Sequence, residues 1–173
     1  VSGGPKKAMK GKLSLMLSSK ENIYKKNLAL LKDIGNNIYN LGNNIGTGST
    51  VKIINNCLAG IQIVSAAEAI MLAKKEKIDL KKIFKIISNS SGQSWMFTDR
   101  GERMIKKKYF KPLSRLSIFK KDMKLANELR KKHFINLPLT KIALKMYEKG
   151  CKQGLENFDD SAVIRLLEKK VFK

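Results

Sequence analysis

The chain has 173 residues, of which 36 are Lys or Arg and 14 are Asp or Glu, so its formal net charge is +22. Hydrophobic residues make up 43% and only three residues are Pro, which excludes a disordered tail. No unbroken run of about 18 apolar residues occurs, so we expect no membrane-spanning helix. Cys57 and Cys151 are too few for a disulfide scaffold, and without a visible signal peptide they favour a reducing, cytoplasmic compartment.

The positive charge raises the question of a polyanionic partner. Only five of the 36 basic residues are Arg, which leaves 31 Lys (36 − 5), and the lysines are spread along the whole chain. Because base readout and bidentate phosphate contacts favour Arg, we do not expect nucleic acid to be the main partner. A non-catalytic basic helical module that binds polyanions or mediates assembly stays open as an alternative function.

The first 46 residues have the pattern of an α/β unit. Residues 12–18 alternate between apolar and polar side chains, which predicts a half-buried strand. Residues 20–35 form an amphipathic helix that Gly35-Asn36-Asn37 ends, and residues 38–42 are a second strand candidate. A strand, a helix and a strand in about 30 residues are typical of a βαβ unit.

Residues 47–173 are predicted to be entirely helical. The longest helix, over 49–76, carries one stripe of side chains: Val51, Ile54, Leu58, Ile61 and Ser65. Asp79 is expected to cap a helix over 79–90, and Asp160 a last helix over 160–171. The remaining helices are expected over 95–108, 115–133 and 138–150. The predicted fold class is therefore mainly α, with a short βαβ remnant at 1–46 before an all-helical domain at 47–173, whose core the helices 49–76 and 115–133 should build.

Metal and nucleophilic chemistry find little support in the sequence. The single histidine, His133, has no acidic or cysteine partner at ligand spacing and is expected near a helix end on the surface. Cys57 and Cys151 are expected to be thiols packed between helices, and no nucleophile elbow is present. We therefore predict no metal site.

Gly46-Thr47-Gly48 begins like a dinucleotide-binding fingerprint. The last Gly of that fingerprint is missing, and so is an acidic residue about 20 positions further on. A plain turn followed by a helix cap is the better interpretation.

Lys52 and Asn56 lie four residues apart near the beginning of the longest predicted helix, and therefore on one face. The positive end of the helix dipole, and any burial, would lower the pKa of Lys52, so that it could exchange a proton with a substrate hydroxyl. The alternative is a solvated lysine beside a polar asparagine.

Ser2, Gly3 and Gly4 combine a hydroxyl group with backbone that a ligand can approach closely. Such a segment after a strand could hold a carboxylate. An ordinary exit from a strand into a turn is the alternative.

Four segments together resemble the β-hydroxyacid dehydrogenases, a family that includes 3-hydroxyisobutyrate dehydrogenase. The segments are Val1-Ser2-Gly3-Gly4-Pro5, with Ala8, Gly11 and Leu13 after it, the run from Gly46 to Asn56, Phe119-Lys120-Lys121-Asp122-Met123, and Asp160-Ser161-Ala162-Val163-Ile164. They are similar to the family's substrate-binding segment, catalytic-lysine helix, C-terminal Lys-Asp segment and last helix, in that order. Residues 92–97 and 109–114 look most like the L-threonate dehydrogenase branch, and Ser114 replaces an aromatic residue of other branches.

The resemblance implies roles for individual residues. Lys52 is implied to be the catalytic general acid/base, and Asn56 to orient Lys52 and the substrate. Ser2, Gly3 and Gly4 are implied to bind the substrate carboxylate. Lys121 is implied to contact the nicotinamide cofactor, with Asp122 supporting it nearby. For Trp95, lining the cleft and filling the core both stay open.

The resemblance also implies what lies outside these residues. In the family, a Rossmann-type domain with a Gly-rich fingerprint precedes the Val-Ser-Gly-Gly segment. This chain begins at Val1, in residues that read like the end of a strand entering a turn. We therefore expect the C-terminal half of a dehydrogenase that acts on a small hydroxy acid, with a domain of the 6-phosphogluconate dehydrogenase C-terminal type. It should be inactive without its Rossmann domain. The resemblance implies NAD as cofactor, with NADP open, and a homo-oligomer that pairs through its helical domains.

Overall fold

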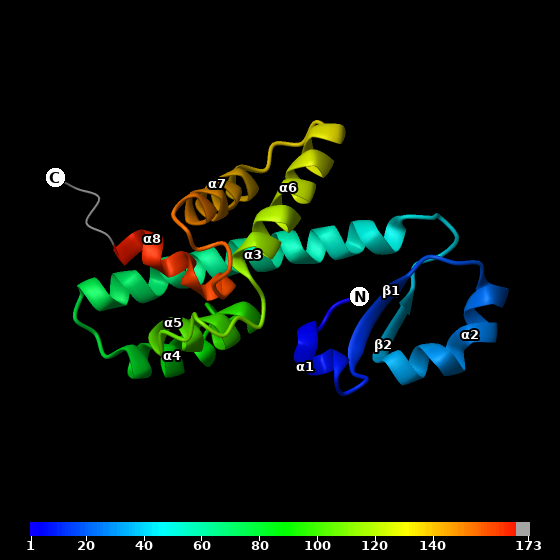
Figure 1. Ribbon diagram of the computed structural model, residues 1–173, viewed down its shortest axis with the longest axis horizontal. Coiled ribbons are helices and arrows are strands. Elements are labelled where there is room, and N and C mark those ends of the chain that lie inside the picture. Colours follow the sequence, from blue (N-terminus) through cyan, green and yellow to red (C-terminus); the bar gives the residue numbers. More distant parts are fainter. Residues whose placement is uncertain (169–173) are drawn as a thin grey trace. The chain divides into compact units, whose positions relative to one another are not determined.

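The computed structural model describes residues 1–168, which form two compact units (Figure 1). The first unit is Val1–Asn55 and the second begins at Asn56. The boundary falls inside one continuous helix, α3 (Thr47–Lys75), whereas the sequence-based boundary between residues 46 and 47 lies at the beginning of that helix.

The first unit contains the predicted βαβ arrangement. Its elements are α1 (Gly4–Ala8), β1 (Leu13–Leu17), α2 (Glu21–Ile34) and β2 (Gly35–Asn40). The two strands pair in parallel, with Leu15 opposite Ile38. Leu15 is the buried centre of the apolar face of β1, as the alternation over residues 12–18 predicts.

The second strand begins earlier than predicted, at Gly35 instead of residue 38. Gly35 ends α2 with an extended backbone (φ −160°, ψ 152°) and at once continues as strand. A Cβ at this position would overlap the carbonyl oxygen of Leu13 in the neighbouring strand. Gly35 therefore permits close strand pairing where the sequence suggested only a turn.

Helix α3 supplies the centre of the core of the second unit. Its buried side chains are small or branched: Ala59, Ile63, Val64, Ala66, Ala67, Ile70, Met71 and Ala73. The stripe that the sequence places on one face lies largely outside this core, since Leu58 is 58% exposed and Ser65 is exposed as well. Alanine and glycine carry little signal in a hydrophobic pattern, yet they form the face on which other helices pack closely.

By length and composition, α3 is apolar enough to cross a membrane. The sequence-based expectation did not indicate this, because it rested only on unbroken runs of apolar residues. Half of its most apolar 18-residue window is buried inside the chain. The core helix of a globular domain has the same properties, and its buried alanines and isoleucines show that α3 packs as such a helix here.

The rest of the second unit is helical. Its elements are α4 (Leu80–Ser88), the π-helical turn η1 (Phe97–Gly101), α5 (Glu102–Ile105), α6 (Leu116–Lys132), α7 (Pro138–Lys152), the 3-10 turn η2 (Asp160–Ile164) and α8 (Arg165–Glu168). Asp79 caps α4 as predicted, because its carboxylate accepts the backbone N–H groups of Lys81 and Lys82 at 2.8 and 2.9 Å.

The predicted cap at Asp160 is wrong. The residue that caps the last helical segment is Asp159, whose Oδ1 accepts the backbone N–H of Ser161 at 3.2 Å. The side chain of Asp160 is directed into an ion pair instead. Residues 169–171 of the predicted last helix lie outside the described part of the chain.

Helices α6 and α7 pack against α3 around Gly60. The hydroxyl group of the fully buried Tyr147 in α7 donates a hydrogen bond to the carbonyl oxygen of Gly60 at 2.9 Å. A Cβ on Gly60 would lie 2.6 Å from the sulfur of Met123 in α6. The missing side chain at residue 60 thus lets α6 approach α3 closely.

Helix α3 begins against the end of strand β1. The N–H of Gly48 donates to the hydroxyl oxygen of Ser18 at 2.7 Å. A Cβ on Gly48 would overlap the carbonyl oxygen of Met16 in β1. The helix can therefore begin at this point only if residue 48 has no side chain.

Replacing Gly48 by Ala should lower the free energy of unfolding by about 1–3 kcal/mol, since the methyl group meets backbone that can move only together with β1. Ser49→Ala is the matched control, because Ser49 is the next residue in the same turn and is exposed. We expect the control to stay within about 0.5 kcal/mol. Chemical denaturation followed by circular dichroism measures both variants, and equal stabilities would contradict the close approach.

Candidate functional site

The glycine turn before α3 forms as the sequence predicts. Gly46 has φ +96°, and the Thr47 hydroxyl donates to the carbonyl oxygen of Asn44 at 2.9 Å. The cap itself comes from Ser18, directly after β1, which the local sequence of the turn does not reveal. The first turns of α3 are thereby fixed at the carboxyl end of a parallel strand, which is where α/β proteins commonly bind ligands.

Lys52 and Asn56 follow in these first turns of α3, one helical turn apart. Both residues are half-buried rather than exposed. The helix places the Lys52 side chain near the positive end of the helix dipole, as expected.

Ser2, Gly3 and Gly4 lie in the same unit as Lys52, where Ser2 forms an isolated bridge with Ser14 and Gly4 is the first residue of the short helix α1. The backbone N–H of Ser2 donates to the carbonyl oxygen of Ser14 in β1 at 2.8 Å, and Ser14 returns a bond of equal length. Gly3 and Gly4 both have positive φ (138° and 62°). The segment is therefore a sharp, glycine-dependent turn that is tied to the sheet.

One contact joins residues that are far apart in the sequence. The side-chain Nδ2 of Asn56 in α3 donates to Oδ2 of Asp122 in α6 at 2.6 Å. The ammonium group of Lys121 lies 2.9 Å from the other oxygen of the same carboxylate. The Asp122 side chain is only 11% exposed, whereas the Lys121 side chain is 67% exposed. The structure thus brings Asn56 and Lys121, two of the predicted site residues, to one shared carboxylate.

Trp95 lies next to the π-helical turn η1 and is 61% exposed. The Arg100 guanidinium carbon lies 6.0 Å from the centre of its ring. Of the two roles that the sequence leaves open, a core aromatic does not agree with this exposure.

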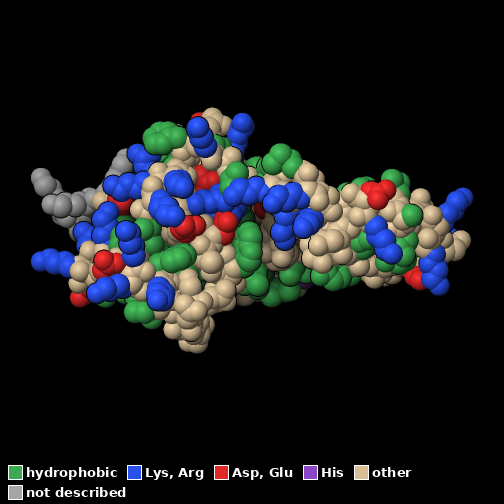
Figure 2. All heavy atoms as spheres, turned by 90° about the horizontal axis from the view of Figure 1, so that it is seen from below, with side chains coloured by type: hydrophobic (Ala, Val, Ile, Leu, Met, Phe, Trp, Pro, Cys, Tyr) green, Lys and Arg blue, Asp and Glu red, His purple; other side chains and the backbone are tan. Residues whose placement is uncertain are grey.

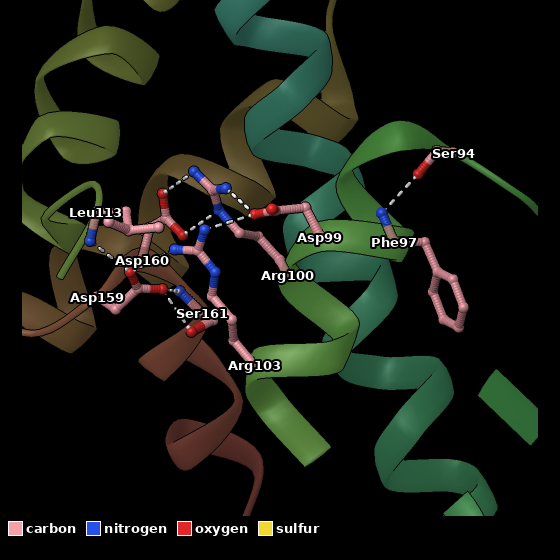
Figure 3. A network of polar contacts seen from close by, with 9 residues as sticks. All are labelled: Ser94, Phe97, Asp99, Arg100, Arg103, Leu113, Asp159, Asp160 and Ser161. Carbon is pink, nitrogen blue, oxygen red and sulfur yellow. Dashed lines mark hydrogen bonds and ion pairs between the residues drawn. The ribbon is translucent and has the colours of Figure 1, made fainter. Parts of the chain in front are cut away.

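A second polar cluster joins η1 and α5 to the chain around residue 160 (Figure 3). Arg100 donates from Nε to Oδ1 of Asp160 at 2.7 Å and from Nη2 to Oδ2 at 3.0 Å. Asp99 pairs with Arg100 and, at 2.8 Å, with Arg103, which also donates to Asp159 at 2.8 Å. The two arginines and three aspartates thus neutralise much of each other's charge.

Asp159 connects this cluster to the preceding loop. Its carboxylate accepts the N–H of Leu113 at 3.0 Å and the hydroxyl of Ser161 at 2.6 Å (Figure 3). Its own N–H donates to the carbonyl oxygen of Tyr109 at 2.9 Å. Since most of its groups are buried and all of them pair with one another, the cluster is suited to holding three segments together rather than to binding a ligand.

Burial raises the pKa of Asp160 to about 6, although the attraction of Arg100 works in the opposite direction. Burial also disfavours the charge of Arg100, but Asp160 and Asp99 outweigh this and hold the pKa of Arg100 above its ordinary value. The arginine therefore stays charged, and Asp160 is the group in this pair that can change its protonation state near neutral pH.

His133 and the two cysteines lie as the sequence predicts. His133 is the exposed C-cap residue of α6. Both cysteines are free and pack against the core, and the sulfur of Cys57 lies 3.2 Å from the Thr140 hydroxyl. Within residues 1–168, no group of three or more His, Cys, Asp or Glu side chains is arranged to hold a metal ion.

Basic side chains are spread over the face that Figure 2 shows. Lys and Arg lie over the left and middle of this face and again near its right end, with acidic, apolar and other side chains between them. This distribution agrees with the spread of lysines along the sequence and differs from the concentrated basic stripe of many nucleic-acid-binding proteins.

Two family models match the chain in succession. Residues 1–42 match the NAD-binding domain of 6-phosphogluconate dehydrogenase, and residues 46–167 match the NAD-binding domain of NADP-dependent 3-hydroxyisobutyrate dehydrogenase. Among curated proteins, the L-threonate dehydrogenase of Haemophilus influenzae is 37% identical over 96% of this chain and 55% of its own length. The 2-hydroxy-3-oxopropionate reductase of Escherichia coli is 30% identical over 97% of this chain and 57% of its own length.

Solved structures give the same result. A 3-hydroxyisobutyrate dehydrogenase from Salmonella typhimurium superimposes with a TM-score of 0.89 at 36% identity, over 96% of this chain and 58% of that one. The Mycobacterium tuberculosis 3-hydroxyisobutyrate dehydrogenase, solved with L-serine, gives 0.87 at 26% identity, over 98% and 60%. The chain thus spans a little more than half the length of the relatives that it matches.

The raised pKa of Asp160 leads to a prediction about stability. The pKa of Asp160 is about 6 in the folded chain and near its ordinary value of 3.8 in the unfolded chain. Between these values the folded chain binds the proton more tightly, so a fall in pH favours the folded state. The wild type should gain up to about 3 kcal/mol relative to Asp160→Asn between pH 8 and pH 3.5. Denaturation followed by the fluorescence of Trp95, the single tryptophan, measures this difference.

Asp79→Asn serves as the control for the sign. The backbone N–H of Lys82 lowers the pKa of Asp79, so its contribution to stability is present at neutral pH and is lost as the pH falls. As the pH falls, the stability of the wild type should rise relative to Asp160→Asn and fall relative to Asp79→Asn. A change in the same direction for both variants would show that the Asp160 carboxyl does not have a raised pKa.

Proposed function

Because this chain belongs to the 3-hydroxyisobutyrate dehydrogenase family, we propose that the protein containing it oxidises the hydroxyl group of a short β-hydroxy acid with NAD. The names of the relatives support an acid that resembles L-threonate or 3-hydroxyisobutyrate. A reducing, cytoplasmic compartment, where the thiols of Cys57 and Cys151 stay free, suits such an enzyme.

The observation that carries this proposal is the junction of α3 and α6. Asn56, one helical turn after Lys52, and Lys121 both contact the carboxylate of Asp122. Asn56 is proposed to orient the substrate hydroxyl, and Lys121 is proposed to contact the cofactor. One carboxylate, that of Asp122, thus contacts a residue proposed for each of these two roles.

Lys121 fits a role at an anionic cofactor, because its ammonium group is largely exposed while its neighbour is buried. When bound, the nicotinamide ring supplies the hydride acceptor. The choice of NAD over NADP depends on the family resemblance, since the groups that distinguish the two would belong to the Rossmann domain. The chain by itself should not turn over substrate, because Lys121 would provide only one edge of the cofactor site.

In the proposed reaction, the substrate C–H bond gives up a hydride and the O–H bond gives its proton to the Nζ of Lys52, which leaves a carbonyl group. Asn56 holds the lysine and the hydroxyl group in line. The N–H of Ser2 is already bonded to Ser14. The carboxylate contact therefore falls to the Ser2 hydroxyl and to the backbone of Gly3 and Gly4.

The apolar side chains that α3 leaves exposed support a homo-oligomer. Leu58 and Leu72 are exposed, and their 14-residue separation is close to four helical turns, so both lie on one stripe with Ser65 between them. Apolar side chains that repeat on one exposed face of a helix are suited to packing against another protein surface. A second copy of the chain is the proposed partner.

Replacing Lys52 by Arg in the complete enzyme should lower kcat by about 10²–10⁴-fold, nearly as much as Lys52→Ala. The guanidinium group keeps the positive charge but cannot accept the hydroxyl proton near neutral pH. Lys75→Arg, an exposed lysine at the end of the same helix, is the matched control and should turn over normally. Steady-state kinetics decide the matter: a Lys52→Arg enzyme that keeps more than about a tenth of wild-type kcat rules out the acid/base role.

Light scattering tests the proposed pairing. The chain should run as a dimer or larger, and Leu58→Asp together with Leu72→Asp should shift it to a monomer, because two carboxylates cannot be buried without partners. Leu30→Asp is the control, since Leu30 is equally exposed but lies on α2. A wild-type chain that is monomeric at high concentration would contradict the proposal.

A further inference from the structure

Asp122 combines strong burial with two polar contacts of different kinds. Its carboxylate accepts from the neutral amide of Asn56 at 2.6 Å and from the charged ammonium of Lys121 at 2.9 Å. Exposed pairs on the same helix, such as Lys131 with Glu128, join two solvated side chains and fix little. A buried carboxylate, in contrast, must keep its partners, because losing them leaves a desolvated charge.

The contact also determines which way the Asn56 amide faces. An ionised carboxylate only accepts hydrogen bonds, and an amide has one donor end and one acceptor end. The end of Asn56 at 2.6 Å from Asp122 must therefore be the NH2 group, since a carbonyl oxygen at that distance would be repelled. The carbonyl oxygen of Asn56 is consequently directed away from Asp122.

We propose that Asp122 is a positioning residue that acts through Asn56, in addition to holding Lys121. By fixing the amide, it presents the Asn56 carbonyl oxygen as an acceptor for the protonated Lys52 or for the substrate hydroxyl. The ammonium group of lysine has only donors, so an acceptor is what orients it. This inference rests on the proposed dehydrogenase function. It connects Asn56, which is proposed to orient the substrate hydroxyl, with Lys121, which is proposed to contact the cofactor.

A double-mutant cycle in the complete enzyme tests the link. Asp122→Ala and Asn56→Ala should each lower kcat by about 10- to 100-fold, and the double variant should be no slower than the slower single variant. Asp122→Asn should keep kcat within about threefold, because its amide oxygen can still accept from Asn56. Glu128→Ala, at an exposed position on α6, is the control and should leave kcat unchanged.

A second readout does not depend on activity. In the 173-residue chain, Asp122→Ala should shift the side-chain amide resonances of Asn56 and speed their hydrogen exchange, whereas Glu128→Ala should leave them in place. Thermal unfolding confirms that both variants are folded. Unchanged Asn56 resonances in a folded Asp122→Ala chain overturn the proposal, and so do additive losses of kcat in the cycle.

The outcomes also separate this proposal from the proposed function. If the complete wild-type enzyme oxidises no hydroxy acid, the proposed function fails whatever the resonances show. If the enzyme is active and Asp122→Ala turns over normally, the function stands and the positioning role of Asp122 is wrong.

Discussion

The hydrogen bond from the buried hydroxyl of Tyr147 to the carbonyl oxygen of Gly60 determines how the helices of the second unit meet. A buried hydroxyl group needs a partner, and this one finds it on the backbone of α3 only because α7 lies close by. Gly60 in turn leaves the space that Met123 of α6 occupies. Asp122 precedes Met123, and Asn56 lies one turn before Gly60, so the same close packing brings the carboxylate within 2.6 Å of the amide.

Local patterns predict most elements but not their packing. The βαβ unit and the Asp79 cap depend on residues near one another in the chain, and both are found where the sequence places them. The early start of β2 at Gly35 depends on Leu13, which lies 22 residues earlier and whose carbonyl oxygen no local pattern can reveal. Likewise, the core face of α3 is marked by alanine and glycine, which a search for large apolar residues passes over.

The candidate site divides in the same way. Short motifs single out Lys52, Asn56, Lys121 and Asp122. The hydrogen bond between Asn56 and Asp122, in contrast, joins residues 66 positions apart that no local pattern relates. The ion pair of Asp160 with Arg100 is of the same kind. Two consecutive aspartates before a helix are equally good caps by sequence, and only the position of an arginine 60 residues away decides that Asp159 caps and Asp160 pairs.

Helix α3 sets the spacing of two of the predicted site residues. The helix is continuous from Thr47 to Lys75, and the boundary between the two compact units falls inside it, between Asn55 and Asn56. Lys52 and Asn56 are four residues apart in this helix, so the helical rise of about 1.5 Å per residue separates them by about 6 Å along its axis. Inserting one residue between them would rotate one side chain by about 100° relative to the other.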